Sequence, residues 1–291
     1  MLMSELSVYE AFRKTCARFP TEPFLYTTSG VAEHYKIEPG EVSYGAALDQ
    51  VERLRECYRA AGYGVGHRIG LMLDNRPSFI MHWFALNALG VSVVPINAEL
   101  SAVEQAYLLE ASEVCLLVHA DEHTATARAA VSQLVREIPI LDPGAINSVC
   151  RASSAARKVS IDSSSECAIL FTSGSTGQPK GCLLSNEYFL EMGRWYCDVG
   201  GLCALGDGVE RLITPLPLTH MNAMGTSLMA MVMCGGCLIQ LDRFHPRIWW
   251  QTVHESRATV IHYLGVMPAI LLQLGAGEFE RNTEIKFGFG A

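Results

Sequence analysis

The residues best suited to bind an anion lie together in one run, Thr172 to Gly181, with the sequence T-S-G-S-T-G-Q-P-K-G. Its glycines allow positive φ angles and a close approach of the backbone, so successive N–H groups can point at one anion. Its serine and threonine hydroxyls add donors, and Lys180 adds a mobile positive charge for phosphate oxygens. The run therefore predicts a binding loop for a polyphosphate.

This run differs from the common P-loop, in which Gly precedes the Lys and Ser or Thr follows it. Here Pro179 precedes Lys180 and Gly181 follows it. A flexible Ser/Gly linker is the alternative interpretation. However, the apolar runs on either side, 168–171 and 182–184, each predict a strand, and linkers seldom lie between two such strands. We therefore favour the phosphate loop.

The run resembles the phosphate-loop signature T-S-G-S-T-G-x-P-K-G of the AMP-forming adenylating superfamily, which includes acyl-CoA synthetases, firefly-luciferase-like enzymes and peptide-synthetase adenylation domains. The resemblance implies an α/β fold with two facing α/β sheet subdomains, which form the large N-terminal domain of adenylate-forming enzymes. It also implies ATP or AMP, Mg²⁺ and coenzyme A as cofactors. The loop residues that it assigns to nucleotide binding are Thr172, Ser173, Gly174, Ser175, Thr176, Gly177, Lys180 and Gly181.

A histidine follows a predicted strand in the segment Leu216 to Asn222, Leu-Pro-Leu-Thr-His-Met-Asn. An imidazole there can hydrogen-bond a carboxylate or phosphate oxygen, and its charge responds to that partner. Taken alone, the segment favours a capping or core histidine. The resemblance implies that His220 is catalytic and lies beside the acyl-adenylate, with Asn222 in the substrate pocket. Thr219 departs from the Phe or Tyr that the superfamily more often has before this histidine.

Two glycine-containing segments further along the chain also resemble parts of the superfamily. Gly265-Val-Met267-Pro resembles the segment that lines the acyl pocket, although a strand-to-helix turn with Pro in the first helical turn fits equally well. Phe287-Gly-Phe-Gly290-Ala291 resembles the strand whose small residues let adenine lie against the backbone, since glycine in a strand often marks close approach. Aggregation-resistant edge strands also use glycine there.

Metal-ligand and disulfide patterns are weak. His119 and His123 are spaced i, i+4 but flank Asp121 and Glu122 in a segment expected to be an exposed loop, so no metal site is predicted. Cys234-Gly-Gly-Cys237 lacks a second pair at zinc-ligand spacing, and it predicts a helix end that turns into a strand. The ten cysteines show no framework spacing, and no signal-peptide pattern opens the chain. We therefore expect free thiols and a cytoplasmic location.

The composition indicates a globular protein, with 49% hydrophobic and 18% charged residues. A net charge of −8 without a Lys/Arg run argues against a nucleic-acid partner. Residues 212–241 contain no Asp, Glu, Lys or Arg, but prolines, glycines and polar residues interrupt the run, so no membrane span is expected. The expected partners are a small carboxylic acid, ATP and coenzyme A, and the oligomeric state is left open.

Capping boxes, glycine and proline positions and hydrophobic periodicity predict an alternation of strands and helices. Asp74-Asn75-Arg76-Pro77 predicts a strand end and a helix cap, residues 30–40 a loop, and 148–165 a surface connection. Helices are expected at 7–19, 43–61, 77–89, 101–111, 124–136, 186–196, 221–234, 246–256 and 268–274. Strands are expected at 24–28, 68–73, 91–96, 114–118, 138–141, 168–171, 182–184, 212–216, 237–241, 259–264 and 285–289. Such alternation predicts parallel sheets covered on both faces.

We expect a first α/β block at about 62–190, which contains the phosphate loop at 172–181, and a second block at about 200–291, joined by 1–60. Several parts of the superfamily have no counterpart in residues 1–291. They are the segment whose Glu helps to hold Mg²⁺, the ribose-binding Asp, the hinge and the C-terminal domain with the catalytic Lys. The chain is therefore expected to be a partial N-terminal AMP-binding domain, incomplete at its C-terminus, that binds ATP weakly and does not turn over.

The reaction implied by the resemblance joins a carboxylate to ATP, giving acyl-AMP and pyrophosphate, and a thiol then attacks to give a thioester. The details resemble carnitine/crotonobetaine-type and medium-chain acyl-CoA ligases, but no residue identifies the acid. Two other hypotheses stay open at this point. One is a non-catalytic nucleotide- or acyl-binding remnant, and the other is the adenylation domain of a peptide synthetase.

Overall fold

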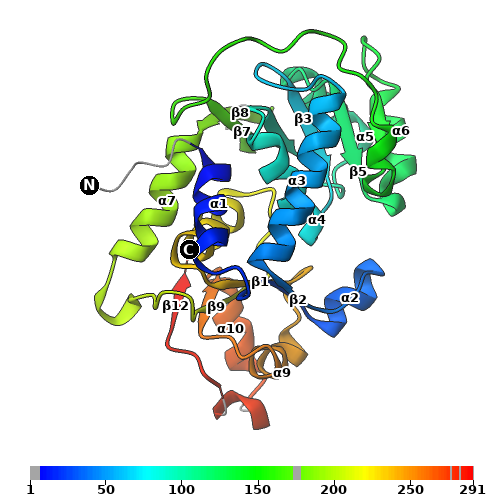
Figure 1. Ribbon diagram of the computed structural model, residues 1–291. Helices are drawn as coiled ribbons and strands as arrows, with labels where there is room; N and C mark the ends of the chain where they lie inside the picture. Colours follow the sequence, from blue (N-terminus) through cyan, green and yellow to red (C-terminus); the bar gives the residue numbers. More distant parts are fainter. Residues whose placement is uncertain (1–6, 173–177, 276, 282, 291) are drawn as a thin grey trace. The chain divides into compact units, whose positions relative to one another are not determined.

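The computed structural model describes residues 7–172, 178–275, 277–281 and 283–290. These residues form an α/β fold with two six-stranded mixed sheets and helices packed against them (Figure 1). The chain divides into two compact units, each of which contains one sheet. The first unit comprises the described parts of 1–11, 49–74 and 78–190, and the second comprises 12–48, 75–77 and the described parts of 191–291.

The sheet of the first unit has the strand order β6-β5-β3-β4-β7-β8. Its neighbouring strands are parallel except β8, which runs antiparallel to β7. The strands are β3 (Arg68–Met72), β4 (Ser92–Pro95), β5 (Leu116–His119), β6 (Ile140–Leu141), β7 (Glu166–Thr172) and β8 (Lys180–Ser185). Apolar residues of α5 (Ala102–Ala111) and α6 (Thr124–Val131) pack with these strands in one buried cluster. The helix α4 (Pro77–Asn87) is buried over 79–87, as expected for a helix apolar on all sides.

The sheet of the second unit has the strand order β12-β11-β9-β10-β1-β2. Here only β2 runs antiparallel to its neighbour, β1. The strands are β1 (Pro23–Thr27), β2 (Gly40–Ser43), β9 (Arg211–Thr214), β10 (Cys237–Gln240), β11 (Val260–Tyr263) and β12 (Phe287–Gly290). Its helices include α2 (Ser29–Tyr35), α8 (Leu228–Cys234), α9 (Trp249–Glu255) and α10 (Val266–Gln273). The N-terminal strand β1 lies beside β10, far along the chain, as the register pair Leu25–Leu238 shows.

Four helices contain a boundary between the units within their own length: α1 (Val8–Arg18), α3 (Tyr44–Ala60), α4 and α7 (Asn186–Asp198). In the first unit a pair of buried asparagines, Asn87 and Asn186, links the ends of three helices. Asn87 Nδ2 donates to Asn186 Oδ1 at 2.8 Å, and the backbone amides of Val8 and Tyr9 donate to Asn186 Oδ1 and Asn87 Oδ1. The beginning of α1 is thereby fixed to the end of α4 and the start of α7.

The sequence prediction was wrong about residues 30–40. They are not a loop but contain most of α2 and the first residue of β2. The helix begins because the Thr28 side chain accepts a hydrogen bond from the Val31 amide, and it ends at Lys36 in the left-handed region. A seven-residue helix that contains Gly30 has little intrinsic stability, which is why propensity did not reveal it.

Other differences concern the sheets and the helix ends. The sheets are mixed rather than parallel, because β2 and β8 pair antiparallel at two sheet edges. The helix expected at 124–136 ends at Val131, and the one expected at 268–274 begins at Val266, so Pro268 lies in its first turn. Residues 246–256 divide into a 3₁₀ turn, Pro246–Ile248, and α9.

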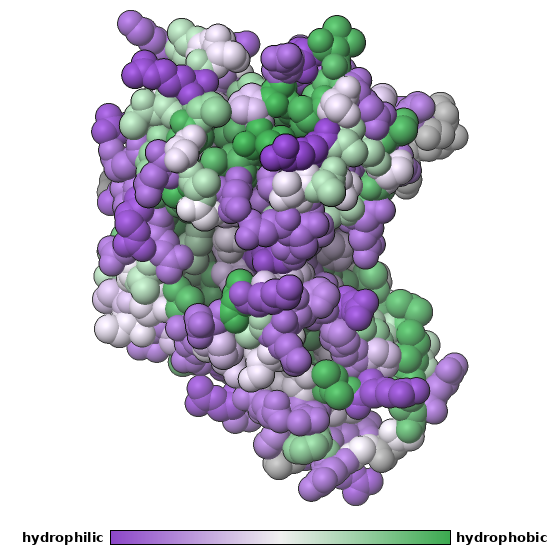
Figure 2. Space-filling model, turned by 90° about the vertical axis from the view of Figure 1, so that its right-hand side faces the viewer, coloured by the Kyte–Doolittle hydropathy of each residue, from purple (hydrophilic) through white to green (hydrophobic). Residues whose placement is uncertain are grey.

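The uncharged stretch 212–241 forms β9, a π-helix, α8 and β10, which confirms the predicted strand, helix and strand. Within the described residues no helix combines the length and the apolar character needed to cross a membrane. Apolar side chains nevertheless reach the surface, as the green areas in Figure 2 show. On α10, for example, Leu272 is 84% exposed.

An ion pair with a buried carboxylate holds the amino-terminal edge of the second sheet. Glu210, Thr259 and Lys286 each directly precede one of the neighbouring strands β9, β11 and β12. The buried Glu210 carboxylate accepts hydrogen bonds from Lys286 Nζ at 2.7 Å, Thr259 Oγ1 at 2.5 Å and the Gly206 amide at 2.8 Å. Burial alone would raise the pKa of Glu210, but these hydrogen bonds and the Lys286 charge together lower it.

We expect Glu210→Gln to lower the free energy of unfolding at pH 7 by about 1–3 kcal/mol, since a neutral amide replaces a carboxylate with charged partners. Because the pKa of the folded carboxyl is lowered, its stabilisation is present above the unfolded glutamate pKa and is lost as pH falls through the folded pKa. The free energies of unfolding of the original protein and the variant, measured with urea, should therefore converge as the pH is lowered. A difference that stays constant down to pH 3 would contradict this, and the exposed Glu38→Gln is the control.

Candidate functional site

The described part of the predicted phosphate loop is its two ends. Thr172 ends β7, Lys180 begins β8, and the two residues pair across the antiparallel ladder. The loop therefore joins the two strands of a hairpin, and the strands predicted on either side of it are present. Ser173, Gly174, Ser175, Thr176 and Gly177 lie outside the described residues, and their assignment to nucleotide binding stays a prediction.

The second end of the loop is held in place by α5. The hydroxyl of Tyr107 donates to the carbonyl oxygen of Pro179 at 3.1 Å. A Cβ at Gly181 would lie 3.0 Å from the Ile169 side chain on the paired strand, so a larger residue here would require that side chain to shift. The backbone on both sides of Lys180 is thus positioned, while the Lys180 side chain is exposed and can reach a ligand.

The residues predicted in the second unit lie at the carboxyl ends of three neighbouring strands. His220 follows β9, Gly265 follows β11, and Gly290 ends β12, in the sheet order β12-β11-β9. These strands are parallel, so their carboxyl ends meet at one edge of the sheet. Ligands of open α/β sheets commonly bind outside this edge. Ala291, the other predicted adenine contact, lies outside the described residues.

His220 occupies a turn that leads directly into a π-helix. Its amide donates to the carbonyl of Pro217 at 3.0 Å, and its side chain is exposed. The π-helix, Asn222–Ser227, replaces the beginning of the predicted α-helix. A Cβ at Gly225 would lie 1.7 Å from the end of the Met221 side chain, so a larger residue there would force this flexible side chain to move. Such π-helical turns are frequent at functional sites.

The turn before this histidine is held by Asn75, a buried residue far away in sequence. Asn75 Oδ1 accepts from the Leu218 amide at 2.8 Å. Asn75 Nδ2 lies within hydrogen-bonding distance of three carbonyl oxygens, those of Leu216 at 3.3 Å, Leu241 at 2.8 Å and Asp242 at 3.3 Å. One amide therefore joins the segments that follow β9 and β10. The sequence suggested only a helix cap at this position.

A second histidine supports the π-helix from β11. His262 is buried, and its Nδ1 lies 2.6 Å from Oγ of Ser227, the last residue of the π-helix. Burial lowers the pKa of His262 to about 4, so this imidazole is neutral at pH 7. It therefore positions the chain, whereas the exposed His220 is the histidine available to a ligand at this edge.

The glycines of β12 accommodate an aromatic ring of the neighbouring strand. A Cβ at Gly288 would lie 3.0 Å from the Tyr263 ring, and one at Gly290 would lie 2.8 Å from it. The ring of Tyr263 thus lies directly against this strand. This packing accounts for both glycines by itself, so the contact of Gly290 with adenine stays a prediction.

The two residues predicted for the acyl pocket are differently placed. Gly265 is exposed and immediately precedes α10, which agrees with the strand-to-helix turn. Met267 is buried, and its side chain packs in the core cluster with Trp249 and Val253 of α9. Asn222, the third predicted pocket residue, is partly buried at the start of the π-helix. Of these three residues, Gly265 and Asn222 therefore have surface that a ligand could contact, whereas Met267 does not.

Three side chains of the first unit could together hold a divalent cation. The ligand atoms of Asp74, Glu122 and His123 lie within 4.8 Å of one another. Asp74 follows β3, while the other two residues follow β5, the neighbouring parallel strand. His123 Nε2 lies 2.6 Å from Asp74 Oδ2, whereas His119 Nδ1 lies 3.0 Å from the carbonyl of Ala120. The expected absence of a metal stays a prediction.

Comparison with protein families gives the decisive observation. The model of the family described as AMP-binding enzyme matches residues 12–287. The chain belongs to the AMP-binding enzyme family. The family resemblance seen in the loop sequence is thereby confirmed.

Curated relatives agree with the family match. The chain is 29% identical over 262 residues to a crotonobetaine/carnitine–CoA ligase of Escherichia coli, covering 84% of this chain and 48% of that protein. It is 28% identical over 261 residues to the enzyme of the same name from Salmonella paratyphi A, covering 84% and 49%. The chain spans about half the length of the curated relatives that it matches.

Solved structures confirm the α/β fold. The o-succinylbenzoate coenzyme A synthetase of Bacillus subtilis, in complex with AMP, has a TM-score of 0.76 at 19% identity, with 97% of this chain and 67% of that chain covered. A fatty acyl CoA synthetase of Mycobacterium tuberculosis has a TM-score of 0.79 at 19% identity, with 98% and 54% covered. At this identity the likeness concerns the fold.

We expect Tyr107→Phe to weaken ATP binding severalfold, because the variant loses the hydroxyl that fixes Pro179 at the end of the loop. The melting temperature should change little, since Tyr107 is partly exposed and its ring is retained. Equilibrium binding of ATP and a thermal melt measure the two effects. Tyr188→Phe, which removes another partly exposed hydroxyl, is the control, and equal affinities in all three proteins would contradict the expectation.

Asn75→Ala should lower the free energy of unfolding by about 1–3 kcal/mol, because the Leu218 amide and the carbonyl of Leu241 lose a buried partner. Chemical unfolding measures this loss. The matched control is Asn147→Ala at an exposed position, which should have little effect. Comparable losses in both variants would mean that the Asn75 amide does not hold these segments.

Proposed function

We propose that this chain is the large nucleotide-binding part of an ATP-dependent, AMP-forming acid–thiol ligase. The observation that carries the proposal is the phosphate-loop sequence 172–181 in a chain of the AMP-binding enzyme family. The paired ends of this loop and the exposed Lys180 support it. A cytoplasmic location is part of the same proposal.

In the proposed reaction a carboxylate oxygen attacks the α-phosphorus of ATP. The bond from that phosphorus to the oxygen that bridges to the β-phosphate breaks, and acyl-AMP and pyrophosphate form. The donors of 172–181 hold the β- and γ-phosphates and stabilise the charge on departing pyrophosphate. Lys180 supplies a charge-assisted contact to these phosphates. Mg²⁺, when bound, neutralises phosphate charge, and the exposed hydroxyl of Thr172 is an oxygen ligand of the kind it accepts.

In the second step the sulfur of coenzyme A attacks the acyl carbon, and AMP leaves. His220 is the proposed catalytic residue at the acyl-adenylate, because its imidazole is exposed at the carboxyl edge of the second sheet. Asn222 and Gly265 are proposed to contact the acyl group at the same edge. Met267 is proposed to support the acyl site from behind this edge without contacting the acyl group, because its side chain is buried.

The names of the curated relatives suggest the class of acid. They are crotonobetaine/carnitine–CoA ligases, so we propose a small or medium-length carboxylic acid as the substrate. The test is ATP–pyrophosphate exchange with a panel that contains crotonobetaine, carnitine, medium-chain fatty acids and amino acids. Exchange stimulated by amino acids alone would favour a peptide-synthetase adenylation domain. ATP binding without any exchange would favour the non-catalytic remnant.

We expect Lys180→Ala to weaken ATP binding about ten- to a hundredfold, because hydrogen bonds to charged groups contribute about 1.5–3 kcal/mol. The melting temperature should barely change, since the Lys180 side chain is exposed. Lys158→Ala, another exposed lysine of the first unit, is the matched control. An unchanged affinity for ATP in a folded Lys180→Ala protein would contradict the phosphate-loop assignment.

A further inference from the structure

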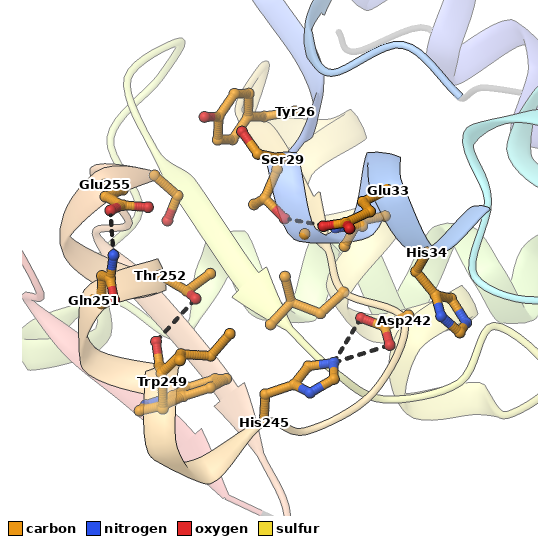
Figure 3. A pocket seen from close by; sticks show the side chains of 16 residues that line it. Tyr26, Ser29, Glu33, His34, Asp242, His245, Trp249, Gln251, Thr252 and Glu255 are labelled. Atoms are coloured by element: carbon orange, nitrogen blue, oxygen red, sulfur yellow. Dashed lines mark hydrogen bonds and ion pairs between the residues drawn. The ribbon is translucent and has the colours of Figure 1, made fainter. Parts of the chain in front are cut away.

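A cavity of about 480 Å³ lies within the second unit, between α2, the segment after β10, and α9 (Figure 3). None of the residues proposed for the nucleotide or the acyl group lines it. The cavity is therefore lined by residues other than those proposed for the reaction.

The wall of the cavity carries negative charge from carboxylates. Glu33 of α2, Asp242 after β10 and Glu255 of α9 contribute three carboxylates from three different elements, as Figure 3 shows. Its described lining contains no Lys or Arg, and its other titratable groups of note are His34 and His245. Such a wall repels the phosphates of ATP or coenzyme A and attracts a cation.

Asp242 provides the most buried charge of the cavity. Its side chain is only 5% exposed, and its two carboxylate oxygens lie 3.0 and 2.9 Å from Nε2 of His245. His245 compensates the charge of Asp242 in full only when the imidazole is protonated. The guanidinium of Arg243 is 3.7 Å away, but its side chain is 73% exposed and therefore well solvated. A buried carboxylate of this kind favours a further cationic partner.

The hydrogen-bonding groups of the wall indicate what kind of cation fits. The hydroxyl of Thr252 donates to the carbonyl of Ile248 at 2.9 Å, and the amide group of Gln251 donates to Glu255 at 2.7 Å. The one hydroxyl donor of Thr252 and one of the two N–H donors of Gln251 are thereby engaged, while Thr252 Oγ1 and Gln251 Oε1 keep the capacity to accept hydrogen bonds. A ligand that supplies N–H donors together with positive charge would match these acceptors and the carboxylates of the wall.

Part of the remaining wall is apolar. Val31, Leu241, Ile248 and Trp249 also line the cavity, and they can pack against a methylene chain. We propose that this cavity binds a short aliphatic amine that carries two or more ammonium groups. Each ammonium group offers three N–H donors, which match a wall rich in carboxylates and other acceptors.

The test is calorimetric titration of the full chain with putrescine and spermidine at low salt. Tetramethylammonium, which has charge without N–H donors, and Mg²⁺, which has charge alone, are the comparison ligands. We expect saturable binding with one site and an affinity for the diamine at least tenfold above both comparison ligands. Equal affinities for all four cations, or no binding at millimolar concentration, would overturn the proposal.

Two variants locate the site. Asp242→Asn and Glu255→Gln should each weaken putrescine binding at least fivefold, whereas Glu38→Gln, an exposed carboxylate outside the cavity, should not. Glu255 is exposed, so its variant tests the site even where Asp242→Asn fails to fold. Unchanged putrescine affinity in folded Glu255→Gln protein would overturn the assignment. ATP binding and ATP–pyrophosphate exchange are measured in parallel, since their absence would contradict the proposed ligase function without affecting amine binding.

Discussion

The side-chain amide of Asn75 is the constraint on which the loops of the second unit depend. It accepts from Leu218 and donates toward Leu216, Leu241 and Asp242, so the segments after β9 and β10 have one common anchor. The first segment leads to the histidine proposed for catalysis, and the second supplies the buried carboxylate of the cavity. Burying this amide without hydrogen-bond partners would lower the free energy of unfolding by about 1–3 kcal/mol. Its hydrogen bonds therefore hold the segments at this edge of the sheet in place.

The two edges of this sheet are therefore stabilised in different ways. At the amino-terminal edge, the buried Glu210 carboxylate is paired with the half-exposed Lys286 and with Thr259, and no ligand is needed to satisfy it. At the carboxyl edge the strands end in turns that are tied to one another by Asn75, while His220 is left exposed. Parallel strands thus place a closed ion pair at one edge and an open surface at the other.

Much of the fold and the family could be predicted from local sequence patterns. The phosphate loop is a contiguous motif, and the strands around it are short apolar runs, so both are visible without tertiary information. Asn75 and Tyr107 were missed as positioning residues because their partners, Leu218 and Pro179, are remote in sequence. The antiparallel edge strand β2 was missed for a related reason, since its pairing with β1 is decided by tertiary context rather than by propensity.

The interleaving of the two units has a consequence for the order of events during synthesis. Asn75 leaves the ribosome early, but the Leu218 amide that it binds lies 143 residues later in the chain. Likewise, β1 is complete long before β10, its parallel neighbour, has been made. The first sheet has all its strands by Ser185, whereas the second must wait for the last residues of β12. Until β10 and Leu218 have been made, a nascent chain therefore carries the strand pair β1–β2 without its neighbour and the Asn75 amide without its partners, a state in which chaperone binding would be most useful.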